Sequence, residues 1–124
     1  MKFATVINCM DGRVQIPVIE WMRKNFGVEY VDMITEPGPD KILAENSGET
    51  VINMLKLKTE ISMHVHGSKV IAIAGHFDCA GNPVTEDIHK KQILEAVKNV
   101  KSWKFNAEVI GLWIDKNWKV HRIG

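Results

Sequence analysis

Short apolar segments alternate along the chain with longer segments whose apolar residues recur at helical spacing. Strands are predicted at residues 3–8, 30–34, 69–75, 108–115 and 118–123. The run Val70-Ile71-Ala72-Ile73-Ala74 has no polar interruption, which is typical of a central strand covered on both faces. The last strand is rich in polar residues and therefore predicts an edge strand.

Helices are predicted between these strands, at about residues 17–26, 48–66 and 85–101. Pro17 suits a first helical turn, and Gly27 suits the position just beyond a helix end. Asn46 and Glu49 have the spacing of a capping box at the start of the second helix. The segment 35–39 contains two prolines and a glycine, and predicts a loop.

The predicted element order is β-α-β-α-β-α-β-β, which indicates an α/β fold. Such alternation favours a mainly parallel sheet with helices on both faces, in three layers. Right-handed crossovers leave few topologies, and the flavodoxin-like strand order 2-1-3-4 plus an edge strand is the one we expect. We see no linker or repeat, so residues 1–124 are predicted to form a single domain.

The reactive residues of the chain follow the first and third predicted strands. Cys9-Met10-Asp11-Gly12-Arg13 ends the first, and Gly75-His76-Phe77-Asp78-Cys79 ends the third. In the expected order these strands are neighbours, and ligands bind beyond their carboxyl ends. Two thiolates and one imidazole are a zinc ligand set that leaves one tetrahedral position open, whereas soft sulfur disfavours magnesium and calcium.

Cys9, His76 and Cys79 are therefore predicted to bind one zinc ion per chain. Taken singly, each cysteine could instead be a buried apolar residue. Alternate residues of an extended segment face the same way, so Asp11 and Arg13 are expected on the same side as Cys9. Arg13 can hold the Asp11 carboxylate in a bidentate pair.

The Asp11–Arg13 pair suggests a two-state site. While Arg13 holds it, Asp11 accepts a hydrogen bond from zinc-bound water; once released, Asp11 could itself bind zinc as the fourth ligand. An ordinary ion pair at a strand end is the alternative. Glu36, at the end of the second strand, is either a solvated loop acid or a site residue.

Composition narrows the classes of function. The chain has 16 basic and 15 acidic residues, and this balance argues against an electrostatic role on nucleic acid or anionic membranes. No apolar run reaches the roughly 18 residues that a membrane span needs. The N-terminus does not have the pattern of a signal peptide, so a cytoplasmic location is expected, where cysteines stay reduced.

The two motifs resemble the signature of the β-class carbonic anhydrases, which is Cys-x-Asp-x-Arg after the first strand and His-x-x-Cys after the third. The segment from Gly111 to Trp118 is also similar to the closing strands of that family. The resemblance implies zinc on Cys9, His76 and Cys79 with Asp11 and Arg13 as the catalytic dyad. It further implies reversible hydration of carbon dioxide to bicarbonate by zinc-bound hydroxide, in a homodimer or higher homo-oligomer.

The sequence departs from the family pattern in three places. Only eight residues precede Cys9, so we expect a compact variant without the helical arm that embraces the partner subunit. Glu36-Pro37-Gly38-Pro39 stands where Arg-Asn-Ala-Gly is usual, and Gly12 replaces a small hydroxyl residue. These changes affect the substrate pocket more than the metal ligands.

A zinc lyase of the carbonate dehydratase type is therefore the expected function. Two alternatives stay open. The zinc could serve a hydrolase of another small electrophile such as carbonyl sulfide. It could also serve a non-catalytic structural or sensing module, which a permanent Asp11–zinc bond would favour. The residues do not identify a proton shuttle.

Overall fold

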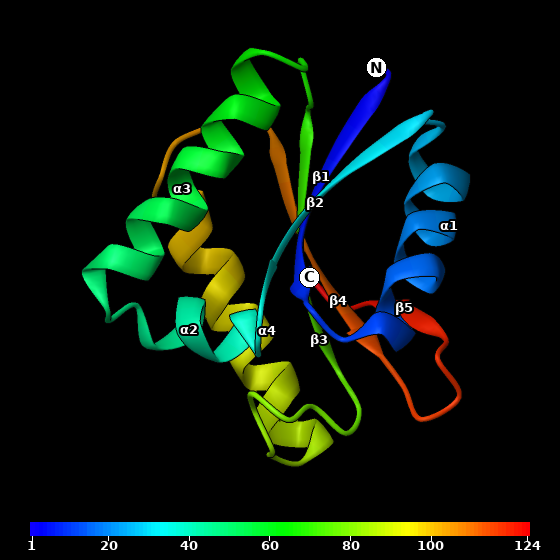
Figure 1. The fold of residues 1–124 in the computed structure, drawn as a ribbon, viewed down its shortest axis with the longest axis vertical. Helices are drawn as coiled ribbons and strands as arrows, with labels where there is room; N and C mark the ends of the chain where they lie inside the picture. Colours follow the sequence, from blue (N-terminus) through cyan, green and yellow to red (C-terminus); the bar gives the residue numbers. More distant parts are fainter.

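A five-stranded sheet lies between helix α1 on one face and helices α2, α3 and α4 on the other (Figure 1). The computed structural model describes residues 1–124. The strands are β1 (Phe3–Cys9), β2 (Tyr30–Glu36), β3 (Val70–His76), β4 (Glu108–Ile114) and β5 (Val120–Arg122). The helices are η1 (Gly12–Val14, a 3-10 turn), α1 (Gln15–Phe26), α2 (Pro39–Glu45), α3 (Glu49–His64) and α4 (Glu86–Lys101). None of these helices has the length and apolar character needed to cross a membrane.

The strand order is β2-β1-β3-β4-β5, which confirms the predicted fold class and order. The first four strands are parallel, and β5 runs antiparallel to β4 at the edge. All seven residues of β3 are buried, as its unbroken apolar run predicts. Val70, Ala72 and Ala74 pack on the α1 side, while Ile71 and Ile73 pack beneath the other three helices.

Helix α2 is the one α-helix that the sequence pattern did not predict. Gly38 at φ 61° turns the chain, and Pro39 then occupies the first helical turn, where its missing N–H has no cost. Asn46 at φ 51° ends α2, and its backbone N–H donates to the Ile42 carbonyl. The predicted capping box is therefore wrong: α3 begins after Gly48 with no side-chain cap. Asn46 instead ends the preceding helix α2.

The other helix ends agree with their sequence signals. Gly27 at φ 65° ends α1, as expected for a residue just beyond a helix. Thr85 is the N-cap of α4, and its hydroxyl accepts a hydrogen bond from the Ile88 backbone N–H. Side-chain chemistry close in sequence thus determined these ends.

A buried hydrogen-bonded cluster joins α2 to α4 beneath the end of β3. His89 Nδ1 lies 2.6 Å from Asp40 Oδ2, and each side chain is only 1% exposed. Asn82 Nδ2 donates to Asp40 Oδ1 at 3.1 Å. A Cβ atom on Gly75 would collide with the Asp40 carboxylate, so the carboxylate packs directly against the strand that carries His76.

Replacing Asp40 with alanine should strongly destabilise the fold, because His89 would be left buried without its partner. We expect Asp40→Ala to lower the free energy of unfolding by about 3 kcal/mol in urea denaturation. The matched control is Glu86→Ala, which removes an exposed pair with Lys90 and should cost less than about 1 kcal/mol. Equal losses in the two variants would contradict a stabilising role of the buried pair.

Candidate metal centre

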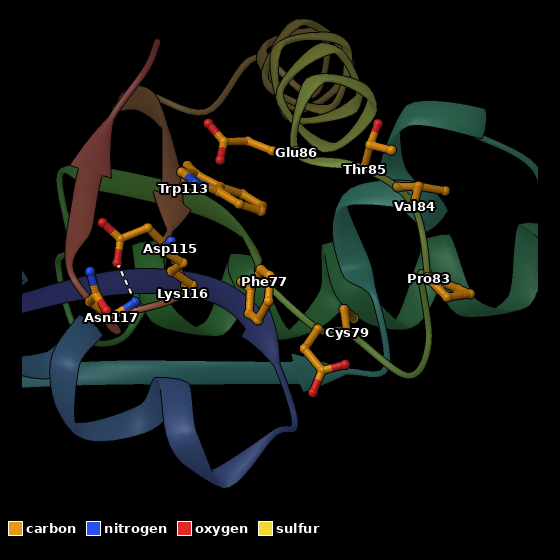
Figure 2. Close-up of a pocket in the computed structure, with 11 residues that line it drawn as sticks. Phe77, Cys79, Pro83, Val84, Thr85, Glu86, Trp113, Asp115, Lys116 and Asn117 are labelled. Carbon is orange, nitrogen blue, oxygen red and sulfur yellow. Dashed lines mark hydrogen bonds between the residues drawn. The ribbon is translucent and has the colours of Figure 1, made fainter.

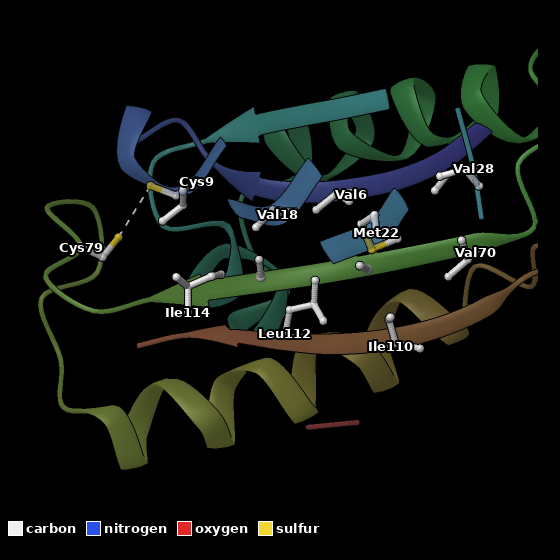
Figure 3. Close-up of a cluster of buried hydrophobic side chains, with 14 residues drawn as sticks. Val6, Cys9, Val18, Met22, Val28, Val70, Cys79, Ile110, Leu112 and Ile114 are labelled. Carbon is white, nitrogen blue, oxygen red and sulfur yellow. Dashed lines mark hydrogen bonds between the residues drawn. The ribbon is translucent and has the colours of Figure 1, made fainter. Parts of the chain in front are cut away.

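Cys9, His76 and Cys79 meet at the carboxyl edge of the sheet. Cys9 ends β1, His76 ends the neighbouring strand β3, and Cys79 follows three residues later. All three side chains are buried, and their ligand atoms lie within 4.8 Å of one another. Figure 3 shows the two sulfur atoms facing each other across the gap between β1 and the loop after β3. The predicted convergence of the two strand ends is therefore present.

The spacing of these atoms fits a tetrahedral metal ion. Cys9 Sγ and Cys79 Sγ are 3.8 Å apart. Two thiolates bound at about 2.3 Å to one tetrahedral zinc ion are separated by about 3.8 Å, whereas a disulfide needs about 2.05 Å. The two cysteines are thus placed as ligands and not as a bridge.

His76 is oriented as a ligand through its other nitrogen. Its Nδ1 lies 2.7 Å from the carbonyl oxygen of Phe77, which can only accept, so Nδ1 carries the hydrogen. Nε2 is buried and has no hydrogen-bond partner. A buried polar atom without a partner is costly, and a metal ion beside the two sulfurs would satisfy it.

The electrostatics of the three groups favour a cation. A hydrogen bond from Cys79 lowers the pKa of Cys9 to about 3, and backbone hydrogen bonds from Gly38 and Asp11 act in the same direction. The pKa of Cys79 is raised, because its proton is held by the Cys9 thiolate. Burial is the largest single influence and acts to lower the pKa of His76, but Cys9, the Phe77 carbonyl and the Asp11 charge together outweigh it, and the pKa is raised.

The loop that replaces the family's usual sequence contacts the centre through its backbone. Gly38 packs against Gly81: a Cβ on Gly38 would lie 2.8 Å from the Gly81 carbonyl carbon. Such an approach leaves no room for a side chain on either residue. The sequence analysis did not identify these glycines, although Pro37-Gly38-Pro39 and Ala80-Gly81 were visible as turn signals.

Glu36 ends β2 directly opposite Cys9, but its side chain is not part of the ligand cluster. It lines a shallow hollow together with Gly48, Glu49 and other residues at the start of α3. It is not among the side chains whose ligand atoms cluster at the centre. Of the two interpretations of Glu36, the structure favours an acid outside the ligand cluster, at the end of β2.

Asp11 and Arg13 form the predicted pair, but through a different local structure. Strand β1 ends at Cys9, and Asp11 is the N-cap of the 3-10 turn, where its Oδ1 accepts from the Arg13 backbone N–H at 2.9 Å. The expectation of an extended segment is therefore wrong. Arg13 Nε donates to Asp11 Oδ1 at 3.0 Å and Nη2 donates to Oδ2 at 2.7 Å. Gln15 braces the turn by donating to the carbonyls of Cys9 and Asp11.

The Asp11 carboxylate lies at the margin of the centre. Its Oδ2 is 4.0 Å from His76 Nε2. The hydrogen bond from Arg13 lowers the pKa of Asp11 to about 2. Asp11 is thus an ionised acceptor beside the ligands, held there by Arg13.

Asp78, which lies between the ligands His76 and Cys79, also contacts Arg13. Its Oδ2 accepts from Arg13 Nη1 at 3.2 Å. Asp78 does not cap the following helix, because α4 begins only at Glu86 and is capped by Thr85.

A cavity of about 560 Å³ opens beside Cys79. It lies between the loop after β3 and the β4–β5 turn, and Phe77, Pro83, Trp113 and Lys116 are among the residues that surround it (Figure 2). Of the three candidate ligands only Cys79 borders it. A small molecule could therefore approach the centre from the Cys79 side.

Comparisons with known proteins place the chain in a family. A family model described as "Putative carbonic anhydrase" matches residues 1–124, and the chain belongs to this family. The fold is that of the β-carbonic anhydrases, which confirms the resemblance seen in the two motifs. No functionally curated protein matches the sequence.

Solved structures show the same architecture at low sequence identity. The β-carbonic anhydrase CcaA is 15% identical with a TM-score of 0.61, over 95% of this chain and 72% of that chain. Tetrameric β-carbonic anhydrases of the filamentous ascomycete Sordaria macrospora are 16% identical with a TM-score of 0.54, over 99% of this chain and 80% of that chain. The β-carbonic anhydrase CafA of the fungal pathogen Aspergillus fumigatus is 15% identical with a TM-score of 0.53, over 98% of this chain and 74% of that chain. At these identities the likeness concerns the fold.

The low pKa of Asp11 gives a testable titration. In metal-free protein, the Asp11 carboxyl carbon should show little change in NMR chemical shift between about pH 7 and pH 4, because its pKa is about 2. In Arg13→Leu the midpoint should rise toward the ordinary value of about 3.9. The stabilisation from this pair is therefore present above about pH 4 and is lost as the pH falls toward 2.

The control for this titration is Arg23→Leu, which removes an exposed arginine from α1. It should leave the Asp11 midpoint unchanged. A wild-type midpoint near 4 would mean that Arg13 does not hold the carboxylate in solution.

Proposed function

We propose that the chain binds one zinc ion through Cys9, His76 and Cys79 and catalyses the reversible hydration of carbon dioxide to bicarbonate. The observation that carries the proposal is the ligand geometry: two sulfurs 3.8 Å apart beside a buried, unpartnered His76 Nε2. When bound, zinc supplies the Lewis acidity that brings the pKa of a water molecule to about 7, which makes a nucleophile available at neutral pH. Membership of a carbonic anhydrase family supports this choice of reaction.

Asp11 would orient the nucleophile. Its carboxylate is within reach of the position next to His76 Nε2, and Arg13 holds it by two side-chain hydrogen bonds. With a pKa of about 2 the carboxylate stays ionised near neutral pH, so it can accept a hydrogen bond but does not retain a proton. The proton released by the reaction must therefore leave through another group or through solvent.

Carbon dioxide would approach through the cavity beside Cys79. Phe77, Pro83, Val84 and Trp113 give this cavity apolar walls, which suit a small molecule without charge. A second candidate is hydrolysis of another small electrophile such as carbonyl sulfide at the same metal, since the same apolar walls would admit it. The cavity and the Asp11–Arg13 pair together weigh against a purely structural zinc site.

Two further expectations accompany the proposed reaction. A homodimer or higher homo-oligomer is supported by relatives of the same fold that are described as tetrameric. A cytoplasmic location is compatible with the site, because two free cysteines whose sulfurs lie 3.8 Å apart stay reduced in a reducing compartment.

Metal analysis tests the ligand set directly. Purified wild-type protein should contain about one zinc per chain by inductively coupled plasma mass spectrometry, since structural and catalytic sites of this kind bind one ion. Cys9→Ser should lose most of the metal while circular dichroism shows a folded chain. His64→Ala, at an exposed histidine on α3, is the control and should retain zinc. A folded wild-type protein without bound metal would contradict the proposed site.

Stopped-flow measurement of carbon dioxide hydration tests the reaction. We expect activity in the zinc-loaded wild type, none above background in Cys9→Ser, and a loss of roughly 100-fold in Asp11→Asn with zinc content unchanged. Hydrolysis of carbonyl sulfide by the same preparations separates the two candidate substrates. A zinc-loaded protein inactive in both assays would leave the non-catalytic alternative in place.

A further inference from the structure

The guanidinium of Arg13 contacts Asp78 and Trp118 in addition to Asp11. We propose that Trp118 is a positioning residue: its indole covers the face of Arg13 and, together with Asp78, keeps Arg13 on Asp11, so that Asp11 stays away from the metal position. The inference rests on the proposed metal site but not on the identity of the substrate. It concerns which group occupies the fourth ligand position.

The N–H groups along the edge of the guanidinium donate to two carboxylates. On one side Arg13 donates to Asp11 from Nε and Nη2, at 3.0 and 2.7 Å. On the other side Nη1 donates to Asp78 Oδ2 at 3.2 Å, and Nη2 donates to the Asp78 carbonyl oxygen at 3.1 Å. Every nitrogen of the guanidinium therefore has a partner in the plane of the group. These contacts fix where the group lies, yet they leave its flat faces uncovered.

Trp118 covers one of those faces. The Arg13 Cζ atom lies 4.6 Å from the centroid of the indole ring, within the range of a cation–π contact. The Arg13 side chain is 46% exposed, so without the ring more of the guanidinium would face water. The ring centroid of Trp118 also lies 6.5 Å from that of the ligand His76. The indole thus lies over the dyad and beside the metal centre at once.

The backbone at Trp118 is unusual for a bulky residue. Trp118 has φ 62° and Asp78 has φ 57°. The left-handed region is uncommon for bulky side chains and would suit glycine or asparagine at lower cost. The β4–β5 turn nevertheless holds Trp118 there: its backbone N–H donates to the Asp115 carbonyl, and the Asp115 side chain accepts from the backbone N–H groups of Asn117 and Lys119.

The consequence follows from the distance between Asp11 and the centre. Asp11 Oδ2 is already 4.0 Å from His76 Nε2, so a small rotation would carry it to the metal if Arg13 let go. Each contact that holds Arg13 in place therefore favours the open position. Because Trp118 lies on the β4–β5 turn, the turn is coupled to the occupancy of the fourth ligand position.

Anion binding to cobalt(II)-substituted protein tests this role without reference to turnover. Azide competes for an open ligand position, and its binding is followed through the visible bands of cobalt. We expect Trp118→Leu to weaken azide binding about three-fold, and Trp118→Phe, which keeps an aromatic face, to bind nearly as well as wild type. The double variant Trp118→Leu, Asp78→Asn should lose about ten-fold, because the ion pair with Asp78 is removed as well.

A second readout examines Arg13 itself. In zinc-loaded wild-type protein the Arg13 Nε–H signal should be shifted by the indole ring current and exchange slowly with solvent. Trp118→Leu should remove both properties, and Trp118→Phe should preserve them in part. Trp103→Leu is the matched control, because Trp103 is also half-buried but packs against Phe105 beyond the C-terminal end of α4.

The outcomes separate this inference from the proposed reaction. Wild-type azide affinity and an unchanged Arg13 signal in Trp118→Leu, or an equal change in Trp103→Leu, would overturn the positioning role. Dependence of azide binding on Trp118 in a protein that hydrates no carbon dioxide would support the positioning role and contradict the reaction. If cobalt does not bind, the proposed metal site fails and the positioning role toward it fails as well; the Arg13 signal of the metal-free protein then decides only whether Trp118 holds the guanidinium.

Discussion

The parallel pairing of β1 with β3 is the constraint on which the metal centre depends. Thr5 lies opposite Ile71 and Ile7 opposite Ile73, so the two strands reach the same edge of the sheet within a residue of each other. Their carboxyl ends carry Cys9 and His76, which are 67 positions apart in the chain (76 minus 9). Apolar contacts on both faces of β3 hold the pairing, because every residue of that strand is buried. The ligands are thus positioned by the core, before any metal contributes.

Close backbone packing extends this order to the loops. Gly38 and Gly81 approach so closely that neither tolerates a side chain, which joins the loop after β2 to the loop that carries Cys79. Beneath them, Asp40 and His89 form a buried pair against Gly75. Such preorganisation means that the candidate metal donors are held in place by their surroundings. The segment that differs from the usual family sequence therefore still supports the centre.

The charged groups around the candidate metal centre have different roles. The two thiols and His76 favour a cation, while Arg13 compensates Asp11 and Asp78 just outside the ligand set. Trp118 covers the arginine from the β4–β5 turn. A carboxylate next to a metal position would otherwise become a ligand. Holding it with an arginine leaves room for a small molecule beside the cavity at Cys79.

Much of this protein is determined by features local in sequence. The apolar run of β3, the alternation of strands with helices, and the Gly27 and Thr85 helix ends sufficed to predict the fold and strand order, because they depend on periodicity and on hydrogen bonds between near neighbours. The meeting of Cys9, His76 and Cys79 followed from that order. Only the tertiary structure decided the partners of Asp40, Gly38 and Trp118, since each contacts residues more than 40 positions away whose approach no local pattern encodes. It also showed that a 3-10 turn forms the Asp11–Arg13 pair, because the carboxylate binds the backbone two residues on and ends the strand.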